Sequence, residues 1–168
     1  PNTPMPAFKT LLTPQQIEDL VVFLRSWQKS GARSAPIIPN TPDKLLLDPT
    51  KSDPAFAVGE KYSKVEFVKS ELDLGKEIIF VDARAPSDYV TAHISGAVNV
   101  PFYEVEKHLS LLPKESWIVT YCACPHAEAE RAANELLKNG YKKVTVLDEG
   151  FLVWRDKGYP IHKGAEPK

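Results

Sequence analysis

Residues 117–140 read WIVTYCACPHAEAERAANELLKNG, and this stretch decides the fold class. Trp117 to Tyr121 is a short run of mostly apolar, β-branched and aromatic residues, which predicts a buried strand. Ala127 to Asn139 predicts a helix, and Gly140 is the residue expected to end it. A strand that is apolar on both faces and is followed by a helix is typical of a parallel sheet covered by helices.

The flanking sequence repeats this alternation of strand and helix. Three further apolar runs predict strands, at residues 78–81, 97–100 and 143–147. Three further segments predict helices, at residues 63–72, 102–109 and 151–157. The first of these helices opens with the capping box Ser63-Lys64-Val65-Glu66, and Gly158 closes the last. We therefore expect an α/β domain over residues 59–165, with an open parallel sheet flanked by helices on both faces.

Composition excludes several classes of protein. The 168 residues carry 21 Lys and Arg against 22 Asp and Glu, a formal net charge of −1. This balance excludes a strongly basic chain, so nucleic acid is not an expected partner. No apolar run approaches the ~20 residues that a membrane-spanning helix requires. Two cysteines are too few for a disulfide framework.

The N-terminal region differs from the rest of the chain. Nine of the 15 prolines precede residue 55, so we interpret residues 31–58 as a Pro-rich linker. Before it, Thr13-Pro14-Gln15-Gln16 predicts a helix start with a capping box, and Gly31 predicts its end. One face of this helix is apolar, with Ile17, Leu20, Val21, Leu24 and Trp27. Because an isolated helix of ~15 residues is marginal in water, we expect this face to be buried on the α/β domain or in a dimer contact.

The two cysteines lie in the loop between the predicted strand and helix at the centre of the chain. Ligands bind at the carboxyl ends of parallel strands, and a helix N-terminus lowers the pKa of a nearby thiol, so this position favours a Cys nucleophile. Three alternatives stay open. Cys122 is a small buried apolar residue, or it binds a metal with Cys124 and His126, or it forms a strained disulfide with Cys124. His126 either lowers the pKa of the Cys122 thiol as an imidazolium or is idle in solvent.

Three motifs in the α/β region agree in order and spacing. The first is Val81-Asp82-Ala83-Arg84 followed by Tyr89-Val90-Thr91-Ala92-His93-Ile94-Ser95-Gly96-Ala97. The second is Cys122 at the end of a strand, and the third is Leu147-Asp148-Glu149-Gly150 with Trp154 and Gly158-Tyr159-Pro160. Together they resemble the rhodanese family of sulfurtransferases, with Ser95 and Glu149 replacing the usual Pro and Gly.

The rhodanese resemblance implies a function and a set of site residues. Cys122 matches the catalytic Cys, which carries a sulfane sulfur as a persulfide from a polysulfide, persulfide or thiosulfate donor to a thiol or cyanide acceptor. The loop around it comprises Ala123, Cys124, Pro125, His126, Ala127 and Glu128. Asp82 and Arg84 are expected to support the site, and His93 is expected to be a packing residue and not a base. No metal or other cofactor is expected in this fragment.

The loop departs from the family pattern, because it holds no Arg, while Glu128 and Glu130 open the next helix. These carboxylates repel thiosulfate, so we expect a polysulfide or protein persulfide as donor. In the related dual-specificity phosphatases an Arg stands at the position of Glu128, and its absence removes the bidentate partner of a phosphate. Arg131 is expected to be a solvated helix residue. Two alternative functions are a non-catalytic docking or redox-sensing module and a dithiol–disulfide switch of Cys122 and Cys124.

The N-terminal segment resembles a different family. Met5-Pro6-Ala7-Phe8 and the helix after it are similar to the C-terminal end of a class I c-type cytochrome, in which such a Met is the axial haem ligand. The resemblance covers residues 1–30 and implies haem c in a longer parent protein, since this chain has no Cys-x-x-Cys-His and begins at Pro1 without an initiator Met. It further implies a periplasmic, bacterial protein of sulfur metabolism.

Overall fold

The computed structural model describes residues 12–29, 39, 42, 45, 47–123 and 126–167. The chain divides into two compact units, Pro1–Pro36 and Ile37–Lys168, which are described separately. The first unit contains helix α1 (Pro14–Lys29), as predicted. Its capping box is formed: the Gln16 amide donates to Thr13 Oγ1 at 3.2 Å, and the Thr13 amide donates to Gln16 Oε1 at 2.9 Å. Leu20, Val22 and Phe23 are exposed on α1, so the described part of this helix presents apolar surface to solvent.

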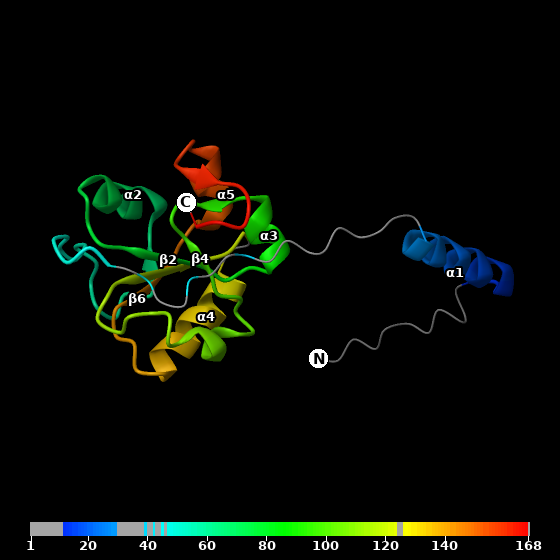
Figure 1. Ribbon diagram of the computed structural model, residues 1–168, viewed down its shortest axis with the longest axis horizontal. Helices are drawn as coiled ribbons and strands as arrows, with labels where there is room; N and C mark the ends of the chain where they lie inside the picture. The colour runs from blue at the N-terminus through cyan, green and yellow to red at the C-terminus, as the bar shows by residue number, and fades with distance from the viewer. Residues whose placement is uncertain are drawn as a thin grey trace. The chain divides into compact units, whose positions relative to one another are not determined.

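The second unit is built on a five-stranded parallel sheet (Figure 1). The strands are β1 (Tyr62–Ser63), β2 (Ile79–Asp82), β4 (Val98–Asn99), β5 (Ile118–Tyr121) and β6 (Val144–Leu147). Their order across the sheet is β1-β6-β5-β2-β4, which places β5 at the centre. Every residue of β2, β5 and β6 is buried, as expected for strands covered on both faces. The predicted α/β fold class is confirmed.

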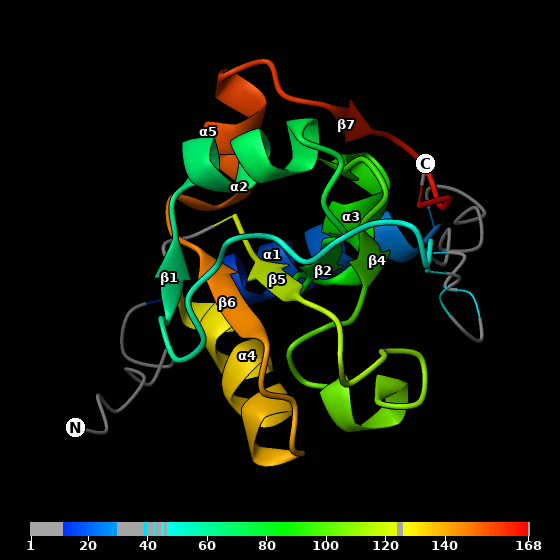
Figure 2. The same ribbon diagram turned by 90° about the vertical axis from the view of Figure 1, so that its left-hand side faces the viewer.

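Helices cover both faces of this sheet (Figure 2). One face carries α4 (Ala127–Lys138) and the 3₁₀ helix η2 (Val105–His108). The other carries α2 (Val65–Asp73), α3 (Pro86–Thr91) and α5 (Gly150–Asp156). A small antiparallel pair, β3 (His93–Ile94) with β7 (Ile161–His162), completes the unit.

Side chains of β5 alternate between the two faces and so fix which residues the site can use. Ile118 and Cys122 belong to the core beneath α4, whereas Val119 and Tyr121 belong to the core beneath α2 and α5. This alternation is the ordinary period of a strand. Cys122 therefore lies on the α4 side and Tyr121 on the α5 side.

The helix predicted at 63–72 is present as α2, but its predicted capping box is wrong. Ser63 lies in edge strand β1, and its Oγ is 3.0 Å from Thr145 Oγ1 on β6. The Val65 amide donates instead to Glu149 Oε2 at 2.8 Å. A side chain from far along the chain therefore caps α2, which a local motif could not indicate. The helix predicted at 102–109 is reduced to the single 3₁₀ turn η2.

The end of the segment predicted as linker packs on the α/β domain. Phe56 is 7% exposed and lies edge-on to Trp117, with ring centroids 5.2 Å apart. The Ala55 amide donates to Glu71 Oε2 at 2.7 Å, and Asp53 pairs with Lys143 at 2.5 Å. The folded unit thus includes residues before 59. Among the described residues no helix is long and apolar enough to cross a membrane.

Candidate active site

Cys122 follows the last residue of the central strand β5, at the carboxyl edge of the sheet. The residue is 1% exposed and packs in the core beneath α4 with Ala83 and Ala129. Its carbonyl oxygen accepts a hydrogen bond of 2.9 Å from the Phe151 amide at the start of α5. The backbone of Cys122 is thereby fixed to the neighbouring β6–α5 connection.

The rest of the predicted loop is only partly described. Ala123 and Glu128 are half-buried and Ala127 is exposed. Cys124 and Pro125 lie outside the described residues, so the predicted metal and disulfide alternatives remain predictions. Within the described part of the chain, no three His, Cys, Asp or Glu side chains are grouped to hold a metal ion.

His126 is the residue before α4, and its ring contacts three residues: Asp148, Tyr62 and Glu130. Its Nε2 is 2.7 Å from the carbonyl oxygen of Asp148 and 2.9 Å from Asp148 Oδ1. Its ring lies 4.5 Å from the ring of Tyr62, and its Nδ1 is 3.9 Å from Glu130 Oε1. Of the two alternatives for His126, the one that leaves the ring idle in solvent does not hold, because the ring is hydrogen-bonded to the turn after β6. The other alternative, an effect on the Cys122 thiol, stays a prediction.

Glu130 is one of the two carboxylates expected to repel an anionic donor. Its Oε2 is 2.9 Å from Lys61 Nζ, and its Oε1 accepts a hydrogen bond from the Tyr62 hydroxyl. The Tyr62 hydrogen bond, and then that of Lys61, holds the pKa of Glu130 below its ordinary value. Since Lys61 balances the charge of Glu130, the expected repulsion of an anionic donor comes mainly from Glu128.

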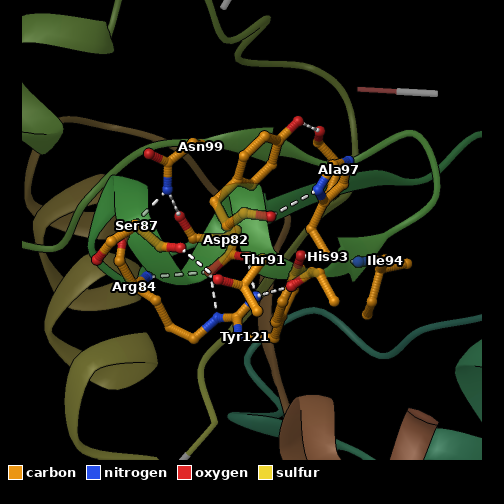
Figure 3. Close-up of polar contacts among 11 residues, drawn as sticks. Asp82, Arg84, Ser87, Thr91, His93, Ile94, Ala97, Asn99 and Tyr121 are labelled. Atoms are coloured by element: carbon orange, nitrogen blue, oxygen red, sulfur yellow. Dashed lines mark hydrogen bonds and ion pairs between the residues drawn. The ribbon is translucent and has the colours of Figure 1, made fainter. Parts of the chain in front are cut away.

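Asp82 and Arg84 form a buried ion pair beside the central strand (Figure 3). Arg84 Nε and Nη2 donate to the two Asp82 carboxylate oxygens at 2.9 and 2.5 Å, and Nη2 also reaches the Ala92 carbonyl oxygen at 2.7 Å. The guanidinium carbon lies 4.3 Å from the ring centre of Phe151. Burial acts to lower the pKa of Arg84, but the hydrogen bond and charge of Asp82 outweigh it and raise that pKa. The ion pair connects the end of β2 to Ala92, the residue before β3, and so stabilises the chain at this edge of the sheet.

His93 and Tyr121 are buried packing residues. His93 is fully buried, stacks on Tyr89 with ring centroids 3.7 Å apart, and has Nδ1 2.9 Å from the Tyr89 carbonyl oxygen. Burial lowers the pKa of His93. The Tyr121 hydroxyl accepts a 3.1 Å hydrogen bond from the Ile94 amide, and burial raises the pKa of this phenol well above its ordinary value. The burial and stacking of His93 agree with the predicted packing role.

Asn99 and Phe102 make contacts around the site that the sequence does not indicate. Asn99 Nδ2 donates to the carbonyl oxygens of Asp82 and Arg84 at 3.1 and 3.0 Å, which supports the turn after β2 (Figure 3). Arg131, predicted to be solvated, is exposed, but its guanidinium carbon lies 4.4 Å from the ring centre of Phe102. No local pattern signals either contact, because each joins segments far apart in the sequence.

Comparison with known proteins agrees with this architecture. The family profile of the rhodanese-like domain matches residues 64–157. A sulfurtransferase of Allochromatium vinosum is 29% identical over 86 residues, covering 51% of this chain and 79% of that protein. An HTH-type transcriptional regulator of Mycobacterium tuberculosis, Rv0324, is 34% identical over 127 residues, and the match covers 73% of this chain but only 56% of the regulator.

A solved structure supports the same assignment. The rhodanese-like domain of the Anabaena protein Alr3790 superposes with a TM-score of 0.58 at 30% identity, covering 63% of this chain and 81% of that domain. The family profile spans more than half of the chain, and the sheet order and the strand–Cys–helix unit lie within it. The chain therefore belongs to the rhodanese-like domain family.

Proposed function

We propose that this chain is a sulfurtransferase whose nucleophile is Cys122. The observation that carries the proposal is the place of Cys122, between the central strand β5 and the start of α4. The positive end of a helix dipole favours a thiolate over a thiol, and the thiolate is the reactive form. Similarity to sulfurtransferases supports the same reading.

The reaction balances with Cys122 as the only covalent group. The Cys122 thiolate attacks the terminal sulfane sulfur of the donor, and the bond between that sulfur and the rest of the donor breaks, with the electron pair leaving on the donor. An acceptor thiolate or cyanide then attacks the outer sulfur of the Cys122 persulfide. The Sγ–S bond breaks, and the thiolate is restored.

We expect the donor to be a polysulfide or a protein persulfide. Lys61 balances Glu130, but no described ion pair balances Glu128 in the first turn of α4. A nearby carboxylate disfavours the approach of the thiosulfate dianion, and the sequence places no Arg between Cys122 and Glu128 to compensate.

Intact-protein mass spectrometry with peptide mapping tests the proposal. The full chain is exposed separately to thiosulfate and to polysulfide. We expect one added sulfur on Cys122 with polysulfide, loss of this addition in Cys122→Ser, and retention in Cys124→Ser. Loss in both variants together with a reversible disulfide would support the dithiol switch instead.

The alternative function is a non-catalytic docking or sensing module. The 1% exposure of Cys122 favours it, because burial limits the access of a donor to the thiol, and similarity to a transcriptional regulator is compatible with it. An unmodified protein with both donors would support this alternative and refute the transferase.

We also propose that residues 1–30 are the end of a c-type cytochrome, with Met5 as axial ligand and haem c in a periplasmic parent protein. The capped helix α1, with its exposed apolar residues, supports this proposal. Met5 lies outside the described residues, and no Cys-x-x-Cys-His occurs in the chain. Haem staining of the natural full-length protein tests it, and a periplasmic fraction without bound haem would refute it.

An α1-mediated dimer is the remaining proposal about the N-terminal unit. Leu20 is 48% exposed on α1, so Leu20→Glu disturbs the apolar face without a change to any core. Light scattering on dilution should show a dimer for the original chain and a monomer for Leu20→Glu. A monomer in both cases would refute the contact.

A further inference from the structure

A surface cavity lies between η2 and α4, and the reaction proposed above does not use it. Its volume is about 350 Å³, which falls within the roughly 300–1,000 Å³ of sites for small molecules. The two helices are in contact on the face of the sheet that also carries Cys122 (Figure 2). Phe102 and Tyr103 form an aromatic wall of the cavity, with their rings edge to face and their centroids 5.2 Å apart. The cavity therefore admits a small organic molecule.

Arg131 lines this cavity with a positive charge that no described carboxylate balances. Its guanidinium carbon lies 4.4 Å from the ring centre of Phe102, and Arg131 forms no ion pair with any described residue. Glu135, one turn further along α4, has the spacing of a partner for Arg131, but it pairs with Lys138 at 3.2 Å instead. A guanidinium that stacks on a ring keeps its N–H donors available at its edge. This planar fork matches the two oxygens of a carboxylate.

A negative charge on the same cavity is also unbalanced. Three glutamates line the cavity, and one of them, Glu104, pairs with Lys107 at 2.8 Å. The hydrogen bond from Lys138 holds the pKa of Glu135 below its ordinary value, so Glu135 is ionised at neutral pH. Glu106 contacts Glu135 and forms no ion pair with any described residue. Two neighbouring carboxylates favour a cation beside them.

Phe102 relates this cavity to the proposed nucleophile. The Phe102 amide donates to the Ala83 carbonyl oxygen at 2.9 Å, and the Ala83 amide donates to the Tyr121 carbonyl oxygen at 2.9 Å. These bonds join the chain after β4, β2 and β5, so Phe102 and Cys122 are separated by two strand spacings, about 10 Å across the sheet. Phe102 also packs against the core cluster that contains Cys122. One wall of the cavity therefore lies at the same edge and on the same face of the sheet as Cys122.

We propose that this cavity binds the amino-acid portion of a small thiol, with its carboxylate on Arg131 and its ammonium against Glu106 and Glu135, and that this thiol accepts the sulfur from Cys122. A ligand with one charge of each sign fits because the cavity has one unbalanced charge of each sign. An anion alone would leave the two carboxylates without a cation.

The acceptor role rests on the proposed sulfurtransferase, whereas the binding of the ligand does not. In the transfer, the thiolate of the bound acceptor attacks the outer sulfur of the Cys122 persulfide. The Sγ–S bond breaks, its electron pair stays on Cys122 as the thiolate, and the acceptor leaves as a persulfide.

Binding is measured first, without any sulfur chemistry. The full chain is titrated with S-methyl-L-cysteine, which has both charges and no free thiol, and the amide signals are followed by NMR. We expect saturable shifts at η2 and in the first turns of α4. Arg131→Gln should raise the dissociation constant about tenfold, which corresponds to about 1.4 kcal/mol and is typical of a hydrogen bond to a charged group. Arg131→Lys keeps the charge without the fork and should recover part of the affinity.

Two further variants test the ammonium contact and the specificity of the effect. Glu106→Gln removes a partner of the ammonium and should raise the dissociation constant about threefold, as expected for an exposed ion pair. Arg155 is an exposed arginine of α5, on the other face of the sheet, so Arg155→Gln is the matched control for the loss of a surface guanidinium. Arg155→Gln should bind S-methyl-L-cysteine as the parent does.

The acceptor role is measured on the preformed Cys122 persulfide in a Cys124→Ser background. L-cysteine carries both charges, cysteamine lacks the carboxylate, and 3-mercaptopropionate lacks the ammonium. At equal thiolate concentration, we expect L-cysteine to remove the sulfur fastest. Arg131→Gln should slow removal by L-cysteine and by 3-mercaptopropionate about tenfold at low thiol concentration, and should leave removal by cysteamine unchanged.

The outcomes distinguish this inference from the proposed function. The absence of saturable shifts at η2 and α4, or equal affinity in Arg131→Gln and the parent, would overturn the binding site. Binding that is weakened in Arg131→Gln, together with equal removal of sulfur by the three thiols, would support the site and overturn the acceptor role. The same binding with no persulfide on Cys122 from any donor would support the site and refute the transferase.

Discussion

Replacing Asp82 by Asn should destabilise the domain strongly, although the two side chains have nearly the same shape. Asp82 is fully buried, and Arg84 is 5% exposed. The carboxylate accepts three hydrogen bonds from Arg84, from its amide, Nε and Nη2. Asn would offer one acceptor and place an NH₂ group against a guanidinium donor. A buried cation would then lose its partner charge.

The expected magnitude follows from this loss. Breaking a buried ion pair by removing one partner costs ~3–5 kcal/mol, and Asn retains part of the hydrogen bonding, so we expect about 3 kcal/mol. For a domain of this size the melting temperature should fall by roughly 10 °C. Urea unfolding at neutral pH, followed by circular dichroism, measures the free energy directly.

A matched substitution separates burial from charge. Asp73→Asn removes the same charge from the Lys69–Asp73 pair, in which the Asp73 side chain is 63% exposed. Because exposed pairs contribute little, Asp73→Asn should leave the free energy of unfolding within error of the parent. Arg84→Met added to Asp82→Asn should recover stability, since neither position then holds a buried charge. Equal effects of Asp82→Asn and Asp73→Asn would refute the reasoning.

Two further predictions concern the packing around the site. Because burial lowers the pKa of His93, the unfolded chain binds more protons than the folded one below about pH 6.5, so stability should fall as the pH falls from about 7 to 5. His93→Gln should flatten this slope in urea unfolding at a series of pH values, and an unchanged slope would exclude His93 as its origin. Glu149→Ala removes the acceptor of the Val65 amide and should cost about 1 kcal/mol in the same assay. Glu115 is exposed, so Glu115→Ala is the control. An equal loss of stability in Glu115→Ala would contradict the capping role of Glu149.

The sheet could be predicted from the sequence because each central strand is apolar on both faces. Strands β2, β5 and β6 lie within one residue of the predicted ranges. Strands β1, β3 and β7 have two residues each, which is too few to show a hydrophobic period. Helix α3 overlaps the Tyr89–Ala97 motif, which indicates a family and does not by itself predict a helix. These elements owe their conformation to tertiary contacts.

The place of Cys122 in the fold was predictable from the sequence, whereas the contacts around it were not. Cys122 follows directly from the strand–loop–helix pattern. The partner of His126 does not, because Asp148 is 22 residues further along the chain. Ser63 likewise reads as a helix cap until the structure shows its hydroxyl 3.0 Å from Thr145, 82 residues away. Local motifs propose a partner for each polar side chain, but the fold decides which partner is within reach.

The alternation of β5 sets a rule for engineering this domain. Cys122 and Tyr121 are adjacent in sequence, yet they belong to the cores on opposite sides of the sheet. An insertion of one residue within β5 would move each of the two side chains to the opposite face of the sheet. The Cys122 sulfur would then lie on the face where the Tyr121 ring now stacks on Phe151. Insertions between Cys122 and α4 leave this register unchanged. Diversity in substrate choice should therefore be sought by changing the length and composition of the loop, while the length of the strand is kept constant.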